Sequence, residues 1–278
     1  MTLSALFVSS LGTVGLILVS MAVLAAIETA IPLHGRGRWG RAHLGSNLAL
    51  TFLTFATNLA FNLALVMTLT WLRTLDFGLL PRLAPGGWLT GVIAVLALDF
   101  SFYAAHRAMH WIPGFWRFHR VHHSDPAVDV TTTIRQHPGE SVIRYGFLGA
   151  FAIVLGVSPG AFAVYRVWSA LNGLFEHANI RIPRRLDSLL SLVVTTPNMH
   201  KIHHSRVAKE TDTNYGNITS LWDRSFATFT PSARGLDIAY GLDGLDAPAL
   251  QTTAGLLGLP FRDAGASHGE NSSVILPA

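Results

Sequence analysis

The sequence of 278 residues carries a formal net charge of +4; half of its residues are hydrophobic and only 13% are charged. A mean hydropathy of +0.39 is too apolar for an ordinary soluble domain and indicates a polytopic membrane protein. In such a protein the basic excess reflects topology, and no basic–aromatic groove predicts nucleic-acid binding. Cysteine is absent, which excludes disulfides, thiolate zinc sites and cysteine-ligated iron–sulfur clusters. Any metal must therefore be bound by nitrogen or oxygen.

Three long apolar segments within residues 1–105 predict three transmembrane helices. The first contains a single ionisable group, Glu28, and is longer than the roughly 20 residues that span a bilayer, so it predicts a retained span and not a cleaved signal peptide. The third is interrupted only by Asp99 and continues into His106 without a turn residue. The segments cover residues 3–31, 44–72 and 88–105.

A fourth apolar region, residues 145–174, is divided by a Ser-Pro-Gly break. The break predicts either a hairpin that enters the membrane and returns or two short tilted spans. Residues 178–278 are more polar, and residues 265–278 predict a loosely ordered tail. The expected fold is one all-α membrane bundle of about four spans, covering residues 1–278, with a histidine-rich helical cap.

Basic residues predict the orientation of this bundle. None precedes the first span, whereas three follow it and five follow the third span. The positive-inside rule then predicts an N-terminus outside, with the cap in the cytoplasm. Short loops and the lack of an ER-retention ending favour a bacterial inner membrane.

Eight of the 13 histidines fall into three motifs with the spacing of metal ligands. Residues i and i+4 share one face of a helix, while the second and third members of an i, i+3, i+4 set point about 100° apart. Such a set can serve two adjacent metals. The motifs are His106-x-x-x-His110, His119-x-x-His122-His123 and His200-x-x-His203-His204.

The number of candidate ligands predicts two metal ions. Four ligands satisfy a structural zinc ion and three a catalytic one, so eight imidazoles are too many for one zinc. Two redox-active iron ions are favoured because imidazole suits iron and coordination positions would remain for oxygen. Zinc remains a possible substitute, although hydrolysis is disfavoured because there is no HExxH element.

These motifs and their flanking residues resemble the fatty acid hydroxylase / sterol desaturase superfamily of membrane di-iron enzymes. The resemblance covers roughly residues 95–230 and is carried by "LDFSFYAAHRAMHWIPGFWRFHRVHHSDPAVDVTTTIRQHPGE", "NGLFEHANI" and "TTPNMHKIHHSRVAKETDTNYGNITSLWDRSFATF". It implies a four-span helical fold with a cytosolic histidine cap over two irons. It also implies oxidation of an unactivated C–H bond with molecular oxygen and external electrons.

The resemblance assigns the eight clustered histidines as metal ligands. His177, in "FEHAN", matches the last histidine of an HxxxH element whose first position is Gly173 here, and His137 is the candidate that replaces this missing ligand. The alternative for both is a hydrogen bond to a metal ligand instead of a bond to the metal itself. His34, His43 and His268 have no such partners and are interpreted as loop residues.

Carboxylates are expected beside two ions held mostly by neutral imidazoles. We expect Asp99, seven residues before His106, and Glu140 to orient imidazole N–H groups. Further acidic candidates lie in or beside the motifs: Asp125, Asp129, Glu176, Asp212 and Asp223. A polar stripe from Asn47 to Asn62 on the second span predicts interhelical hydrogen bonds, or alternatively a polar channel.

The favoured function is hydroxylation or desaturation of a lipid that enters laterally from the bilayer, with a fatty acid, sterol, alkylglycerol or carotenoid as substrate. Electrons would come from a separate ferredoxin, cytochrome or reductase, because the sequence contains neither a GxGxxG nor a CxxCH motif. Two alternatives are a metal carrier or sensor, which would require ligands at membrane depth, and a metal-dependent hydrolase.

Overall fold

The computed structural model describes residues 3–35, 41–83, 86–232 and 238–262, so the predicted tail at 265–278 and His268 lie outside the described residues. Within these ranges, β-structure is limited to isolated bridges such as Pro32 to Ile180, which confirms the all-α class. The helices, including the 3₁₀ helices η2 and η4, are α1 (Leu3–Ala30), α2 (Leu44–Arg73), α3 (Leu79–Leu83), α4 (Gly87–Trp111), α5 (Pro113–His123), η2 (Val130–Ile134), α6 (Pro138–Leu155), α7 (Pro159–His177), α8 (Arg184–Leu190), α9 (Pro197–His203), α10 (Ala208–Thr211), α11 (Leu221–Ser225), α12 (Thr253–Gly258) and η4 (Leu259–Phe261).

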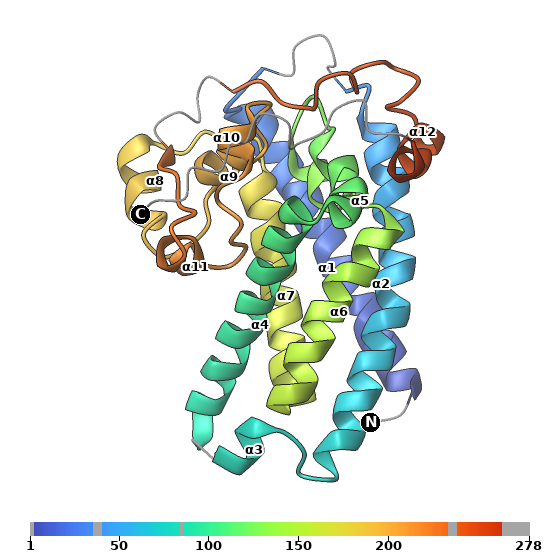
Figure 1. The fold of residues 1–278 in the computed structure, drawn as a ribbon, viewed down its shortest axis with the longest axis vertical. Helices are drawn as coiled ribbons and strands as arrows, with labels where there is room; N and C mark the ends of the chain where they lie inside the picture. The colour runs from blue at the N-terminus through green and yellow to red at the C-terminus, as the bar shows by residue number, and fades with distance from the viewer. Residues whose placement is uncertain (1–2, 36–40, 84–85, 233–237, 263–278) are drawn as a thin grey trace.

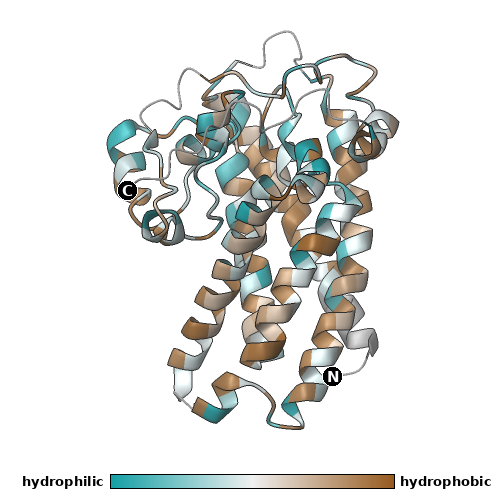
Figure 2. Cartoon of the chain, in the orientation of Figure 1, coloured by the Kyte–Doolittle hydropathy of each residue, from teal (hydrophilic) through white to brown (hydrophobic). Residues whose placement is uncertain are grey.

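The long helices α1, α2, α4, α6 and α7 run along the long axis of the molecule, and most of the short helices gather at one end, which we call the cap (Figure 1). Apolar residues dominate the bundle, whereas polar residues are concentrated in the cap (Figure 2). Residues Ser10–Ala30 of α1, together with α2 and α4, are long and apolar enough to cross a membrane. These three helices lie where the sequence predicted the three spans, and their length and apolar composition indicate an integral membrane protein.

Helices α6 and α7 form a helical hairpin at the Ser-Pro-Gly break, which agrees with either arrangement that the sequence left open. α6 leaves the cap and ends near α3 at the opposite end of the bundle, and α7 returns to the cap (Figure 1). Gly156 ends α6 with φ of 66°, in the left-handed region that favours glycine. A Cβ at Gly156 would lie 2.3 Å from the carbonyl oxygen of Phe77, so only glycine allows this close packing. Pro159 then occupies the first turn of α7.

The hydrophobic core lies between α2, α4, α6 and α7. Leu69, Leu98, Ala152 and Phe162 are all buried there. Other large apolar side chains of the same helices face outward, as expected for helices whose surroundings are lipid. Trp111, at the end of α4, is exposed and lies under the guanidinium of Arg107, a position typical of an aromatic residue at a membrane interface.

Buried polar contacts fix the cap to the bundle. Glu28 of α1 accepts hydrogen bonds from the backbone N–H groups of Val130 (2.8 Å) and Asn179 (2.6 Å), and thereby joins three distant segments. Arg135, fully buried after η2, donates to Asn47 Oδ1 of α2 at 2.8 Å and to Gln251 Oε1 at 2.8 Å. It also donates to the carbonyl of Val121 in α5. Arg135 therefore holds α5, which carries one histidine motif, against α2.

Candidate metal centre

The three histidine motifs converge at the junction of the bundle and the cap, where they form two buried groups with His177. In each group the candidate ligand atoms lie within 4.8 Å of one another. The His106 cluster contains His106, His110, His119, His123 and His203, and the His177 cluster contains His122, His177, His200 and His204.

Two of the motifs divide their histidines between the clusters. His119 and His123 of α5 belong to the His106 cluster, whereas the intervening His122 belongs to the His177 cluster. In the motif on α9, His203 belongs to the His106 cluster, whereas His200 and His204 belong to the His177 cluster. This division confirms the angular argument from the sequence: an i, i+3, i+4 set presents imidazoles to two adjacent sites.

The ring nitrogens within each cluster have the spacing of ligands around one ion. His177 Nε2 lies 3.1 Å from His122 Nε2, 3.0 Å from His200 Nε2 and 3.2 Å from His204 Nε2. In the other cluster, His119 Nε2 lies 3.1 Å from both His106 Nε2 and His123 Nε2. Nitrogens bound about 2.1 Å from a shared ion would be separated by about 3.0 Å in an octahedron and about 3.4 Å in a tetrahedron.

The hydrogen bonds of the opposite ring nitrogens fix which nitrogen is available to a metal. His106 Nδ1 donates to the carbonyl of Tyr215 and His177 Nδ1 to the carbonyl of Gly173, both at 2.8 Å. Their Nε2 atoms therefore carry lone pairs and no proton. A lone pair that faces several imidazole nitrogens at about 3 Å can accept an N–H from only one of them, whereas a shared metal ion would be bound by all of them. The donor set thus fits a metal ion in each cluster.

Burial keeps these imidazoles in the neutral form that binds metals. It lowers the pKa of His122 to about 3, and the neighbouring His203 and Arg144 act in the same direction. Burial likewise lowers the pKa of His200 and of His204 well below the usual value. Neutral imidazole is the ligand form required by zinc, copper and iron.

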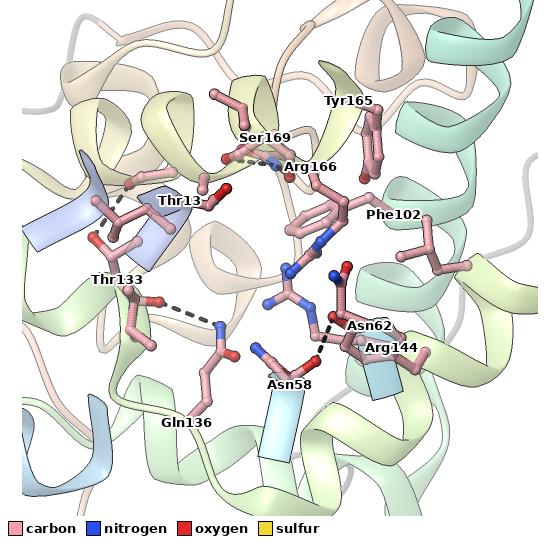
Figure 3. Close-up of a pocket in the computed structure, with 18 of the residues that line it drawn as sticks. Thr13, Asn58, Asn62, Phe102, Thr133, Gln136, Arg144, Tyr165, Arg166 and Ser169 are labelled. Atoms are coloured by element: carbon pink, nitrogen blue, oxygen red, sulfur yellow. Dashed lines mark hydrogen bonds between the residues drawn. The ribbon is translucent and has the colours of Figure 1, made fainter. Parts of the chain in front are cut away.

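A cavity of about 490 Å³ lies among α1, α2, α4, α6 and α7, directly beside both clusters. His106 and His119 line it from one cluster, and His122, His177 and His200 line it from the other. Its volume is within the range of small-molecule sites. The arrangement connects the candidate metal centre with a chamber inside the membrane-spanning bundle, part of which is shown in Figure 3.

Comparison with known families agrees with this geometry. The sequence pattern of the family described as fatty acid hydroxylase matches residues 91–228, a range that contains both clusters. These residues belong to the fatty acid hydroxylase family.

Named relatives of this fatty acid hydroxylase domain act on lipids. The chain is 31% identical to an alkylglycerol monooxygenase of Caenorhabditis elegans, over 59% of its own length and 31% of the relative's. It is 31% identical to the ornithine lipid hydroxylase OlsE of Rhizobium tropici, over 55% and 45% of the two lengths. The human alkylglycerol monooxygenase is 29% identical over 59% of this chain and 34% of its own length. The matched region therefore covers less than half of each relative. No solved structure gives a significant match.

The structure brings His177 into the hydroxylase domain's candidate metal centre but does not bring His137 there. His137 caps α6: its Nδ1 accepts from the N–H of Gly139 at 2.9 Å, and its Nε2 lies 3.3 Å from the carbonyl of Leu257. Both ring nitrogens are engaged, so His137 has none left for a metal. The expectation of a tenth ligand is corrected, and the His177 cluster contains four imidazoles.

One of the two favoured carboxylates contacts a cluster histidine. Glu140 Oε2 lies 3.3 Å from His119 Nδ1, as expected. Asp99 instead accepts hydrogen bonds from the backbone of Ile218 (3.1 Å) and from Trp222 Nε1 (2.9 Å), so its expected contact with an imidazole is corrected. It fixes the loop after α10 to α4. Asp212, which was not favoured, lies 3.1 Å from His110 Nδ1.

His43 is buried and does not behave as the loop residue expected from the sequence. Its Nδ1 lies 3.1 Å from Asp125 Oδ1, and its Nε2 lies 3.5 Å from Asp129 Oδ2. Asp125 also accepts a hydrogen bond from Thr132 Oγ1 at 2.7 Å, which links His43 to η2. No local spacing signals these contacts. The density of polar residues in "SDPAVDVTTT" is the one feature of the sequence that could have indicated a buried network.

The polar stripe on α2 has two roles. Near the cap, Asn47 donates to Asp125 at 2.8 Å and Thr54 donates to the carbonyl of Gln136 at 3.1 Å, as expected for hydrogen bonds between segments. Farther along, Asn58 and Asn62 line the cavity. The two interpretations that the sequence left open therefore apply to different parts of the same helix.

Lys201 is a buried residue that the sequence did not mark. It lies between two cluster histidines in the motif on α9, and it donates to the backbone carbonyls of His177 and Val128. A lysine so placed fixes the end of α7 against the segment before η2. Its position next to His200 was the only available signal, and a lysine there is equally consistent with an exposed face.

Proposed function

We propose that the protein is a membrane-bound, iron- and oxygen-dependent oxidoreductase that hydroxylates a C–H bond of a lipid. The observation that carries the proposal is the position of the two buried histidine clusters beside a cavity within the bundle. The names of the relatives, which include two classes of lipid hydroxylase, support hydroxylation. Desaturation is the alternative outcome of the same hydrogen abstraction.

In this proposal each cluster holds one iron ion, and the iron pair supplies the activation of molecular oxygen. The Nε2 atoms of His106, His177 and His203 would bind the metals, because the Nδ1 atoms of these three residues are engaged with backbone carbonyls. Asp212 holds the ring of His110 and Glu140 holds that of His119, which fixes the direction of the nitrogen lone pairs. Buried, neutral imidazoles of this kind tolerate either zinc or iron, so metal identity must be measured.

The cavity would place the lipid next to the metals. Gly160 and Ala163 line it and are also exposed on the surface of α7, which supports an entry from the lipid side of the bundle. The walls exclude bulk water from the reacting carbon, which limits side reactions of the activated oxygen. Residues 95–230 would form the catalytic region and residues 1–105 most of the membrane anchor.

A separate ferredoxin, cytochrome or reductase would supply the electrons. The absence of cysteine means that this chain holds no cysteine-ligated iron–sulfur cluster of its own. We also propose that the cap faces the cytoplasm of a bacterium and that the protein lies in the inner membrane. The start of α1 at the end of the bundle away from the cap agrees with an N-terminus outside (Figure 1).

Lipid analysis tests this function directly. Bacteria that express the protein should accumulate a lipid that has gained one oxygen atom, and cells that express the His122→Ala variant at the same level should not. Loss of two hydrogen atoms instead would indicate desaturation. A zinc-containing protein whose product forms without oxygen would contradict the proposal and favour a hydrolase.

A further inference from the structure

The cavity contains two arginines within the bundle, Arg144 on α6 and Arg166 on α7. Both guanidinium groups point into the cavity from opposite helices of the hairpin (Figure 3). An arginine inside a membrane-spanning bundle is energetically unfavourable in general, and such residues usually mark a path or a binding site for a charged group. A role for these two residues is therefore expected beyond helix packing.

The positive charge of this pair is only partly neutralised by the protein. Arg144 Nη1 lies 3.4 Å from Glu140 Oε1, and the other carboxylate oxygen of Glu140 lies 3.3 Å from His119 Nδ1, so Arg144 shares its carboxylate with the metal centre. The guanidinium of Arg166 lies 5.3 Å from the centre of the Tyr145 ring. In the described part of the chain, Arg166 forms no ion pair with a carboxylate. An anion in the cavity would complete both sites.

The other residues around the cavity suit the two ends of an amphiphile. Asn58, Asn62 and Gln136 bring amide groups to the same region as the arginines (Figure 3). Much of the remaining lining is apolar and could accept a hydrocarbon chain. It includes Val14, Ile17, Phe55, Leu59, Leu148 and Phe162.

We propose that Arg144 and Arg166 bind the anionic headgroup, a carboxylate or a phosphate ester, of an amphiphile whose chain occupies the apolar part of the cavity. A planar guanidinium binds both groups through paired, charge-assisted hydrogen bonds, which a neutral hydroxyl or ether headgroup does not offer. As a statement about the substrate, this inference rests on the proposed function. As a statement about binding, it does not require oxidation.

The test measures binding to the purified metal-loaded protein, kept without a reductant in a non-ionic detergent, by titration calorimetry. The ligands are laurate, dodecyl phosphate and dodecanol, which share one chain, together with inorganic phosphate. We expect laurate or dodecyl phosphate to bind at least about 10-fold more tightly than dodecanol, as charge-assisted hydrogen bonds require. Equal affinity for dodecanol would overturn the proposal. Binding of inorganic phosphate as tight as that of dodecyl phosphate would indicate a small-anion site and overturn its lipid part.

Variants locate the headgroup. Arg166→Gln and Arg144→Gln should each weaken binding of the preferred anionic ligand by about 10-fold or more, while Arg166→Lys, which retains charge but not the planar fork, should weaken it less. Arg82→Gln, at an exposed position of α3 outside the cavity, is the matched control and should bind like the unchanged protein. Unaltered affinity in folded Arg166→Gln would overturn the assignment. An oxidation-inactive protein that still prefers anionic ligands would refute the proposed function alone.

Discussion

His177 Nε2 lies 3.1 Å from His122 Nε2, although 55 positions separate the two residues in the sequence. His177 also contacts the two other imidazoles of its cluster. Replacement of His177 by alanine should therefore release the ion of this cluster while the His106 cluster keeps its own. We expect bound iron to fall to about half, because the remaining three imidazoles lose the ligand that contacts them all. Elemental analysis of purified protein measures this.

His34→Ala is the matched control for that experiment, because His34 lies outside both clusters. Its iron content should equal that of the unchanged protein. Both variants should be recovered from the membrane in similar amounts. Full iron content in His177→Ala would show that His177 is not a ligand.

His137 provides a second test, since the sequence and the structure assign it different roles. His137→Asn preserves a side-chain oxygen that can accept the hydrogen bond of the α6 N-terminus. We expect this variant to retain its iron and to form its product. His137→Ala should mainly lower the free energy of unfolding, by about 1 kcal/mol. Loss of iron from the asparagine variant would restore His137 as a ligand.

Asp212→Asn should weaken iron binding because Asp212 contacts His110 Nδ1. Removal of such a partner typically costs about 10–100-fold in metal affinity. Competition with a chelator measures the change. Asp99→Asn is the carboxylate control: Asp99 contacts the loop after α10 and no cluster histidine, so its loss should reduce stability and leave metal affinity near its original value. An equal loss of metal affinity in Asp212→Asn and Asp99→Asn would contradict the different roles assigned to the two carboxylates.

Much of the site was predictable because it depends on local spacing. The i, i+3, i+4 motifs of α5 and α9 present imidazoles in two directions, and this property of a helix predicted that their histidines would serve two adjacent sites. The same reasoning located α1, α2 and α4 from uninterrupted apolar runs. The Ser-Pro-Gly break located the turn between α6 and α7.

Contacts between distant segments were not predictable in this way. The position of His137 depends on the backbone of Leu257, and that of Asp99 on Trp222, far along the chain in both cases. Seven residues separate Asp99 from His106 and place them on the same face of α4, yet Asp99 meets a different segment. Sequence spacing fixes the direction of a side chain on its own helix, but the partner in that direction is fixed by tertiary packing.

The contacts of Arg135 also depend on tertiary packing, and its replacement should affect both the stability of the protein and its retention of iron. Arg135→Met would leave the buried oxygens of Asn47, Ser124 and Gln251 without their donor. A broken buried network of this kind costs about 3–5 kcal/mol. We expect a lower unfolding temperature in detergent and faster iron loss. Arg117→Met, on the exposed side of α5, should change neither, and similar behaviour of the two variants would refute the role of Arg135.

Anomalous diffraction at the iron edge is the most direct measurement of the central claim that each histidine cluster holds one ion. The account predicts two anomalous peaks in crystals of the iron-loaded protein, one surrounded by the His106 cluster and the other by the His177 cluster. A single peak, or peaks outside both clusters, would contradict it.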